Sequence, residues 1–358
     1  MSLSRLVVLV STALIGFGLP LPALAAVAAP DASREDSPSA VSWLERAAAA
    51  PDRVSYHGTQ IITSWGPQGA SSAMLDIVHA ASQGSEVTVV GSGGSPGAKA
   101  FVQRADNTVG LTVDGGPLSL LEATYQLVYK CCTDTIGRAA VLIEAMRGDQ
   151  TLAARFWIDK ATGLLLQRQL FSVDGKTLVR ATIFTELQIE DSEFLSHLPP
   201  MTPRGVEAVG MSKVDSLRSQ GWTCSAALPA SLQLYDVHQD TATKSLQFSY
   251  SDGLFNVSLF EQRGVLDPAA VAGYTETTTA SGARVYQRYG MPSYAMWSSN
   301  GIVYTLVGDL PYDQLGQVVA AFPHQPPPRV TAVQRVGTGL AKIAMWLTPM
   351  GALSRKLG

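Results

Sequence analysis

The stretch Tyr250-Ser-Asp-Gly-Leu-Phe-Asn-Val-Ser-Leu-Phe-Glu-Gln262 predicts the fold more directly than any other part of the chain. An Asp-Gly pair between alternating segments predicts a β-hairpin with one apolar face. The stretch contains only two acidic residues, Asp252, which the turn uses, and Glu261 at its far end. It therefore offers no group of catalytic residues, and its apolar face favours a binding protein over an enzyme. The alternating apolar residues are Leu246, Phe248 and Tyr250 before the turn, and Phe255, Val257 and Leu259 after it.

The same alternation recurs along the chain and predicts an α+β protein that is mostly antiparallel β. The turns at 160–163 and 174–175 join the strands between 139 and 187 into an antiparallel meander. Helices are expected after a cap at Ser39 or Ser42, at 117–129 and 213–220, and from Pro311 as first helical residue. Strands are expected at 56–62, 73–79, 86–90, 139–146, 153–159, 164–172, 178–187, 294–299 and 302–307.

A proline cluster, Pro199-Pro200-Met201-Thr202-Pro203, is expected to end the first sheet, because proline cannot donate to a strand ladder. We therefore predict two domains on either side of it. The predicted segments are a signal peptide at 1–25, a disordered leader at 26–38, a first domain at 39–198, a linker at 199–212, a second domain at 213–322, and a proline linker with a cationic tail at 323–358.

Residues 1–25 have the three-part pattern of a secretory signal peptide. Arg5 precedes an apolar run at 6–19, and the small residues of Ala23-Leu24-Ala25 follow at the spacing of a cleavage site. The alternative is an uncleaved anchor helix, but a run of ~14 residues is shorter than the ~20 that span a bilayer. We therefore expect an exported protein, in the periplasm or at the outer face of the cytoplasmic membrane.

The charge is unevenly distributed. A formal net charge of −3 does not favour a nucleic-acid partner. The tail, however, places Arg335 and Lys342 off an apolar stripe with helical spacing, which predicts a cationic amphipathic helix on an anionic membrane surface or in a partner's groove. The alternative is a helix that packs on its own domain. The stripe consists of Val333, Val336, Leu340, Ile343 and Leu347.

The chain has three cysteines, Cys131, Cys132 and Cys224. Adjacent residues of a strand point to opposite faces, so one of the neighbouring pair can face Cys224. In an oxidising compartment this predicts a disulfide between Cys224 and either Cys131 or Cys132, with three free thiols as the alternative. No sequence neighbour is expected to lower the pKa of the pair, so a nucleophilic role is not predicted.

The sequence lacks the short motifs of catalytic, nucleotide and metal sites. Its five histidines are too far apart for a short zinc-binding spacing. It contains no Gly-x-Ser-x-Gly elbow, Walker loop or dinucleotide fingerprint. The glycine-rich loop at 91–97 precedes strand-like residues and not a helix that could hold phosphate. We expect no catalytic residue, no metal and no cofactor.

Taken in order, these elements resemble the RseB/MucB family of extracytoplasmic sigma-factor regulators, in an actinobacterial-type variant. In the first domain the resemblance rests on Tyr56-His57-Gly58-Thr59, His79, Gly137-Arg138, Arg155-Phe156-Trp157-Ile158-Asp159, Thr162-Gly163-Leu164-Leu165-Leu166 and Asp174-Gly175. In the second it rests on Gly221-Trp222, Tyr250-Ser251-Asp252-Gly253-Leu254, Val257-Ser258-Leu259-Phe260 and the strand around Trp297.

The resemblance implies a LolA/LolB-like first domain, which is an unclosed antiparallel half-barrel wrapped around a helix, and a smaller second sheet domain with helices. It further implies a non-catalytic protein that binds the extracytoplasmic part of a membrane-anchored anti-sigma factor. Such a protein protects its partner from proteolysis and responds to a lipid-like signal of envelope stress. The alternative is a LolA-type carrier of lipids or lipoproteins that uses the half-barrel as an acyl-chain pocket. An envelope hydrolase is a third hypothesis.

Two groups of residues are candidates for contacts within this picture. Trp297 and Tyr304 are candidates for the partner contact, because a cross-strand aromatic pair would place them together; the alternative is that both are core. Four residues are candidates for the concave face that would hold an acyl chain, with ordinary core positions as the alternative. These are Phe156, Ile158, Leu164 and Leu166.

Overall fold

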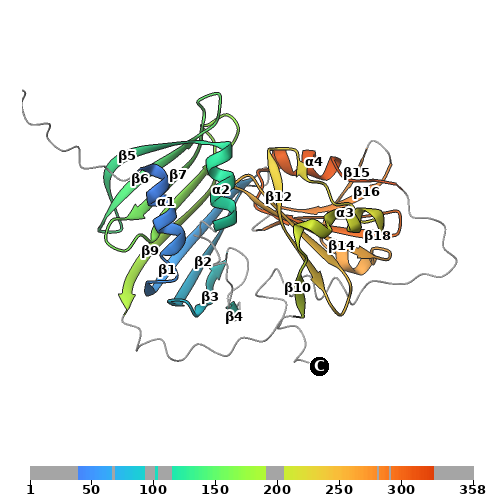
Figure 1. Ribbon diagram of the computed structural model, residues 1–358, viewed down its shortest axis with the longest axis horizontal. Coiled ribbons are helices and arrows are strands. Elements are labelled where there is room, and N and C mark those ends of the chain that lie inside the picture. Colours follow the sequence, from blue (N-terminus) through green and yellow to red (C-terminus); the bar gives the residue numbers. More distant parts are fainter. Residues whose placement is uncertain are drawn as a thin grey trace, which may run out of the picture. The chain divides into compact units, whose positions relative to one another are not determined.

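The computed structural model describes residues 39–66, 69–92, 101–103, 115–190, 205–279, 282–289 and 292–325. These residues form two antiparallel β-sheets with short helices (Figure 1). All of them lie within one compact unit, Pro38–Gly358, so the division into two domains stays a prediction. Four predicted features lie outside the described residues: the segments at 1–38, the glycine-rich loop after Ser92, the proline cluster at 199–203 and the tail after Gln325.

The first sheet is an unclosed antiparallel half-barrel. Its strands are β1 (Ser55–Gly66), β2 (Gly69–Ala80), β3 (Gly84–Ser92), β4 (Phe101–Gln103), β5 (Gln126–Thr135), β6 (Arg138–Met146), β7 (Leu152–Asp159), β8 (Leu165–Phe171) and β9 (Leu178–Glu190). Their order is β4-β3-β2-β1-β9-β8-β7-β6-β5, so β4 and β5 are the two edges within the described residues. The expected meander is present as β6 to β9, and the pairing of β1 with β9 joins it to the first four strands.

Two helices, α1 (Ala40–Ala49) and α2 (Gly115–Thr124), lie against the first sheet (Figure 1). The Ser39 side chain caps α1 as predicted, because its Oγ accepts a hydrogen bond from the Ser42 N–H at 3.1 Å. Leu44 of α1 is fully buried in the hydrophobic core that also contains Leu121 of α2. Burial of one such leucine contributes roughly 2 kcal/mol.

The helix predicted at 117–129 is shorter than expected. It ends at Thr124, and β5 begins two residues later at Gln126. The Tyr125 N–H still donates to the Leu121 carbonyl at 2.9 Å, which completes the last helical turn. The prediction failed because Val128 and its neighbours fit helical spacing and a strand equally well, and the pairing of β5 with β6 decided the outcome.

The second sheet contains both predicted hairpins. Its strands are β10 (Val206–Ala208), β11 (Ala227–Leu228), β12 (Leu232–Asp240), β13 (Leu246–Ser251), β14 (Asn256–Arg263), β15 (Thr275–Thr278), β16 (Arg284–Arg288), β17 (Ser293–Ser299) and β18 (Ile302–Gly308). The order is β10-β12-β13-β14-β18-β17-β16-β15, and β11 pairs with β12. The turn at Asp252-Gly253 joins β13 to β14, and Asn300-Gly301 joins β17 to β18. Five of these strands were not predicted from the sequence: β10, β11, β12, β15 and β16.

Short helices complete the second half. They are the 3₁₀ turns η2 (Met211–Lys213) and η3 (Pro268–Val271) and the α-helices α3 (Val214–Ser219) and α4 (Tyr312–Ala320). The helix predicted at 213–220 is thus present as α3. Pro311 stands at the N-cap of α4 and not at its first helical position.

The turn after β7 is built around the buried carboxylate of Asp159. The Arg138 guanidinium donates from Nε and Nη2 to its two oxygens, at 3.1 and 2.9 Å. The backbone N–H and the hydroxyl of Thr162 donate to Oδ2, at 2.9 and 2.6 Å. Burial acts to raise the pKa of Asp159, but these hydrogen bonds outweigh it and hold the pKa below its usual value.

The same turn fixes α1 to the sheet. Nη2 of Arg46 on α1 donates to the carbonyl oxygens of Lys160 and Ala161, at 3.0 and 2.8 Å. Gly163 has a φ of 84°, and a Cβ at this position would come within 2.8 Å of the Arg46 side chain. The turn therefore needs glycine for its backbone angle and for its contact with α1.

We predict that Asp159→Asn lowers the free energy of unfolding by about 2–4 kcal/mol at pH 7, because Arg138 loses its charged partner. A lowered folded pKa gives stability that is present above the unfolded value of about 4 and is lost as the pH falls through the folded pKa. Urea unfolding at pH 7 and pH 3 checks this. The difference between variant and wild type should shrink at pH 3, and a constant difference would contradict the assignment.

Candidate functional site

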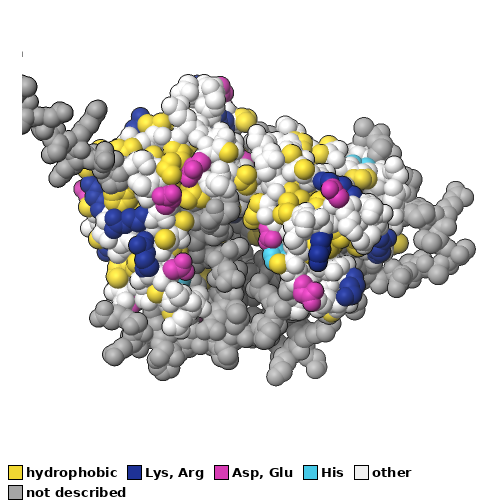
Figure 2. Space-filling model, viewed as in Figure 1, with side chains coloured by type: hydrophobic (Ala, Val, Ile, Leu, Met, Phe, Trp, Pro, Cys, Tyr) yellow, Lys and Arg dark blue, Asp and Glu magenta, His cyan; other side chains and the backbone are white. Residues whose placement is uncertain are grey.

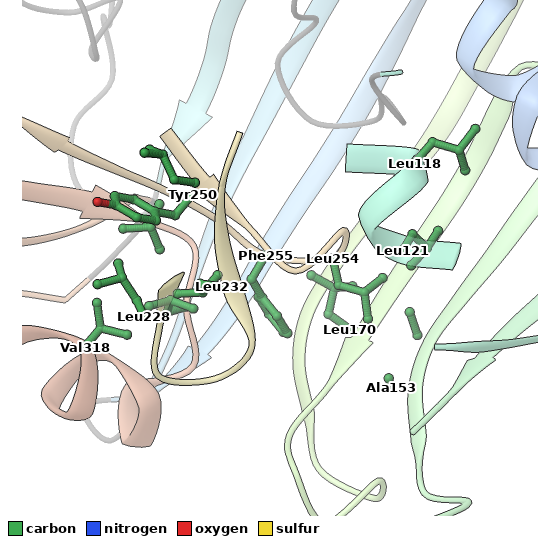
Figure 3. Close-up of a cluster of buried hydrophobic side chains, with 14 of the residues drawn as sticks. Leu118, Leu121, Ala153, Leu170, Leu228, Leu232, Tyr250, Leu254, Phe255 and Val318 are labelled. Atoms are coloured by element: carbon green, nitrogen blue, oxygen red, sulfur yellow. The ribbon is translucent and has the colours of Figure 1, made fainter. Parts of the chain in front are cut away.

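The hairpin turn at Asp252-Gly253 packs against the first sheet and its helix α2. Leu254 and Phe255 of this turn are 0% and 1% exposed. Figure 3 shows Leu254 next to Leu121 of α2 and Leu170 of β8. We call the turn Ser251–Phe255 together with its contacts in the first sheet the sheet junction.

Asp252 organises the sheet junction. Its Oδ1 accepts hydrogen bonds from the backbone N–H groups of Leu254 and Phe255, at 2.8 and 2.7 Å, which shapes the turn. The Tyr125 hydroxyl, at the end of α2, donates to Asp252 at 2.5 Å. Asp252 was predicted to serve the turn alone, but the same carboxylate also binds Tyr125 at the end of α2.

Gly253 brings the two backbones into direct contact. Its φ is 94°, and a Cβ at this position would lie 2.3 Å from both N and Cα of Leu121. Real Cβ atoms do not approach backbone so closely, so no other residue fits without a shift of α2 or of the turn. The Asp-Gly pair therefore serves the contact between the sheets as well as the hairpin.

Two arginines of the first sheet complete the junction. Nη2 of Arg168 on β8 donates to the Leu254 carbonyl. Nη1 of Arg180 on β9 lies 2.7 Å from Oδ2 of Asp309, and both side chains are largely buried. Oδ1 of Asp309 also accepts from the Asn256 N–H at 2.7 Å, so the ion pair connects β9 to the start of β14. Partly buried pairs with such bonds are screened less than surface pairs.

Burial raises the pKa of Asp252 although three hydrogen bonds act against it. Burial and the nearby Asp252 charge raise the pKa of Tyr125. The raised pKa of Tyr125 keeps the phenol protonated at neutral pH, so Tyr125 is the donor of this short, partly buried hydrogen bond. Removal of the phenol oxygen would leave Asp252 with its two backbone donors and no link to α2.

The four candidates for the acyl-chain pocket lie in the hydrophobic core. Phe156, Ile158, Leu164 and Leu166 are all at most 4% exposed, and they share one cluster with Leu44 of α1. Leu118 and Leu121 of α2 belong to the same cluster, so a lipid could reach the four residues only after a helix moves, and their ligand role stays a prediction.

The aromatic pair proposed as a partner contact is formed but buried. Trp297 and Tyr304 face each other across β17 and β18, with ring centroids 5.1 Å apart and nearly parallel planes. They are 0% and 1% exposed, and Trp297 Nε1 donates to the Pro323 carbonyl at 3.0 Å. Neither ring presents an exposed surface in this structure, so a partner contact would require the segment after α4 to move.

Glu261, at the end of the hairpin, is fully buried, and this burial was not predicted from the sequence. Its Oε2 accepts from the Thr223 N–H at 2.9 Å, and burial raises its pKa to about 8. The strand period could have revealed it, because Val257, Leu259 and Glu261 have the same parity and so point to one face.

The predicted disulfide is not formed. All three cysteines are free, with Cys131 and Cys132 exposed on β5 and Cys224 buried in the second half of the chain. The Sγ atoms of the adjacent pair lie 2.7 Å apart. The long-range bridge is absent because Cys224 is buried while the pair is exposed on β5 of the first sheet. The predicted alternation of faces is also interrupted, because the register of β5 against β6 shifts between Tyr129 and Cys132.

The described surface is mixed in charge. On the face shown in Figure 2, Lys, Arg, Asp and Glu side chains lie between hydrophobic ones over both sheets. Among the described residues no three His, Cys, Asp or Glu side chains are grouped to hold a metal ion. In the same residues no helix has the length and apolar character needed to cross a membrane.

No protein-family model and no curated protein matches the chain. Among solved structures, the fold is similar to MucB in complex with MucA(peri), at 18% identity and a TM-score of 0.40, over 78% of this chain and 97% of that one. MucB belongs to the family that the sequence resembles. The MucA/MucB complex of Pseudomonas aeruginosa is similar at 19% identity and a TM-score of 0.41, over 81% of this chain and 99% of that one. A LolA superfamily protein from Nitrosomonas europaea is similar at 11% identity and a TM-score of 0.20, over 43% of this chain and 95% of that one.

We predict that Gly253→Ala destabilises the protein more than Gly273→Ala. Both positions have positive φ, so both variants lose about 1–2 kcal/mol to backbone strain. A Cβ at Gly273 meets nothing within 4 Å, whereas one at Gly253 meets Leu121 and should cost about 1–3 kcal/mol more. Urea unfolding of the two variants measures the difference, and equal losses would show that the close contact is not made.

We predict that Glu261→Gln removes a pH dependence of stability. The folded pKa of about 8 lies above the unfolded value near 4, so the folded state keeps a proton that the unfolded state releases. The free energy of unfolding of the wild type should therefore fall between about pH 4 and pH 8, by a few kcal/mol at most. Unfolding titrations at pH 5 and pH 8 should show a smaller fall for the variant. An equal fall would contradict the buried, protonated acid.

Proposed function

We propose that the protein is a non-catalytic extracytoplasmic regulator that binds the outer part of a membrane-anchored anti-sigma factor, protects it from proteolysis and releases it on a lipid-like signal. The observation that carries this proposal is the sheet junction. The helix that covers part of the half-barrel core, α2, is the same helix that receives the Asp252 turn. An event inside the half-barrel can therefore reach the second sheet through one element.

The half-barrel core explains why a lipid would act on α2. Leu118 and Leu121 of this helix are buried in the same cluster as the candidate pocket residues. An acyl chain that enters must replace these side chains, and each buried CH₂ of the ligand contributes about 0.8 kcal/mol toward the exchange. Movement of α2 then separates Tyr125 from Asp252 and removes the Gly253 contact. A coupling of ~1–3 kcal/mol is enough for a graded switch.

The nature of the partner rests on the family resemblance of the sequence. In the solved complex structures the partner of MucB is MucA. A stable partner contact buries about 800 Å² on each side, which two sheets that meet at a junction can supply. Export, the two-domain division and a contact of the cationic tail with anionic lipid belong to the same proposal. Binding to anionic vesicles with and without residues 329–358 tests the tail.

A lipid or lipoprotein carrier of LolA type is the second candidate, because the unclosed half-barrel alone suffices for it. The second sheet argues against a simple carrier. It is joined to α2 by backbone contact and to β9 by an ion pair, and a shuttle needs neither. Transfer of a fatty acid from the protein to acceptor vesicles, without any effect on an anti-sigma factor, would favour the carrier.

We predict that Tyr125→Phe tightens fatty-acid binding and weakens partner binding, each by up to about tenfold. Loss of this hydrogen bond removes up to about 1.5 kcal/mol from the closed junction, and 1.4 kcal/mol is a factor of ten. A fluorescent long-chain fatty acid and the extracytoplasmic domains of the host's anti-sigma factors are the probes, with affinities measured by titration.

The matched control is Tyr289→Phe, which removes the hydrogen bond from the Tyr289 hydroxyl to Gln287, at 2.7 Å, outside the junction. It should leave both affinities unchanged. If Tyr125→Phe behaves like this control while fatty acid still binds, the half-barrel is not coupled to the second sheet. If no anti-sigma domain binds and fatty acid co-purifies, the carrier replaces the regulator.

A further inference from the structure

Cys131 and Cys132 form a thiol pair on the exposed edge of the first sheet. Both side chains are exposed, and their Sγ atoms lie 2.7 Å apart. β5 is one of the two edge strands of the first sheet within the described residues, and its register against β6 shifts between Tyr129 and Cys132. This irregularity turns two neighbours that would face opposite sides of a regular strand toward each other. The pair is therefore both accessible and close enough to react as a unit.

A lysine from another element completes the group. Nζ of Lys160 donates a hydrogen bond to Sγ of Cys132 at 2.8 Å. Lys160 belongs to the Asp159 turn, where its N–H donates to the Ala139 carbonyl at 2.9 Å and its own carbonyl accepts from Arg46. The ammonium group is thus attached to a backbone that is fixed on both sides. This partner was not predicted, because Lys160 is 28 residues away from Cys132 in the sequence and only the folding of β6 and β7 brings the two together.

The surroundings distinguish the two thiols. The hydrogen bonds from Cys131 and Lys160 lower the pKa of Cys132. The phenol of Tyr129, also exposed, has its pKa raised by slight burial and by the neighbouring Cys131. Nζ of Lys130, which lies on β5 itself, is 3.5 Å from Oε2 of Glu144 instead. Cys132 is therefore the attacking sulfur, since the thiolate is the nucleophile, and Cys131 is the resolving one.

We propose that Cys131 and Cys132 form a reversible two-electron redox site that is oxidised by an external low-molecular-weight disulfide. The Cys132 thiolate attacks one sulfur of the disulfide, so an S–S bond to Cys132 forms and the first thiolate leaves. The Cys131 thiol loses its proton to that thiolate, attacks Cys132 Sγ, and expels the second thiolate as the Cys131–Cys132 bond closes. The second thiolate takes up from water the proton that Cys132 released when it ionised. The external disulfide is thereby reduced to two thiols, and the protein dithiol loses two electrons and two protons.

Cys224 takes no part in this chemistry. It is buried, and burial raises its pKa to about 12, so its thiol stays protonated and out of reach. The redox site is therefore the adjacent pair and not the long-range bridge that the cysteine count suggested. It is independent of the partner and the lipid of the proposed function.

The test uses the full chain and oxidised glutathione. Reduced protein that is denatured and alkylated should carry label on all three cysteines, and oxidised protein on Cys224 alone, without retained glutathione. Cys224→Ser should close the pair like the wild type. Cys131→Ser should stop at a glutathione adduct on Cys132, because the resolving thiol is absent. Intact mass and peptide mapping identify these species.

Lysine variants test the role of Lys160. Lys160→Gln should slow the first step by about tenfold, because the Cys132 thiolate loses the ammonium group that stabilises it. The end product should be unchanged, because Cys131 still closes the disulfide with Cys132. Lys130→Gln is the matched control on the same strand and should react at the wild-type rate. Three alkylated thiols after oxidation, a persistent glutathione adduct on the wild type, or a bond that includes Cys224 would overturn the proposal. Equal rates for the two lysine variants would overturn the role of Lys160.

Discussion

The approach of Gly253 to Leu121 is the constraint on which the rest of the structure depends. A turn of the second sheet meets the backbone of α2 with no space for a Cβ, and a tyrosine–aspartate hydrogen bond locks the contact. Apolar side chains of α2 face the half-barrel core at the same time. One short helix is therefore part of the core of one sheet and part of the contact with the other.

The two helices of the first half are held in different ways. Arg46 of α1 donates to the Asp159 turn, so α1 is fixed by its own sheet. The hydrogen bond of Tyr125 at the end of α2 is instead made to the second sheet, and β5 with its thiol pair begins directly after this residue. This difference makes α2 the element whose position can depend on both sheets. It also places the proposed redox site on the strand that continues from α2.

Most strands and both hairpins could be predicted from the sequence, because alternation and Asp-Gly or Asn-Gly turns are local signals. Contacts between residues far apart in the sequence leave no such local signal, so the hydrogen bond of Asp252 to Tyr125 was not predicted. The contact of Lys160 with Cys132 was not predicted for the same reason. The end of α2 was misplaced because the residues that follow it suit a helix and a strand equally well. The burial of Glu261, in contrast, could have been predicted, because Glu261 and Leu259 are two residues apart on one strand and so point to the same face.

The most direct test of the central claim is hydrogen exchange of the amides of α2 and of the turn 251–255, measured with and without a long-chain fatty acid. A shared helix predicts that the ligand speeds exchange in both segments together, because the turn loses its cover when α2 moves. Faster exchange in α2 with an unchanged turn, or no change in α2 while the ligand is bound, would contradict the account.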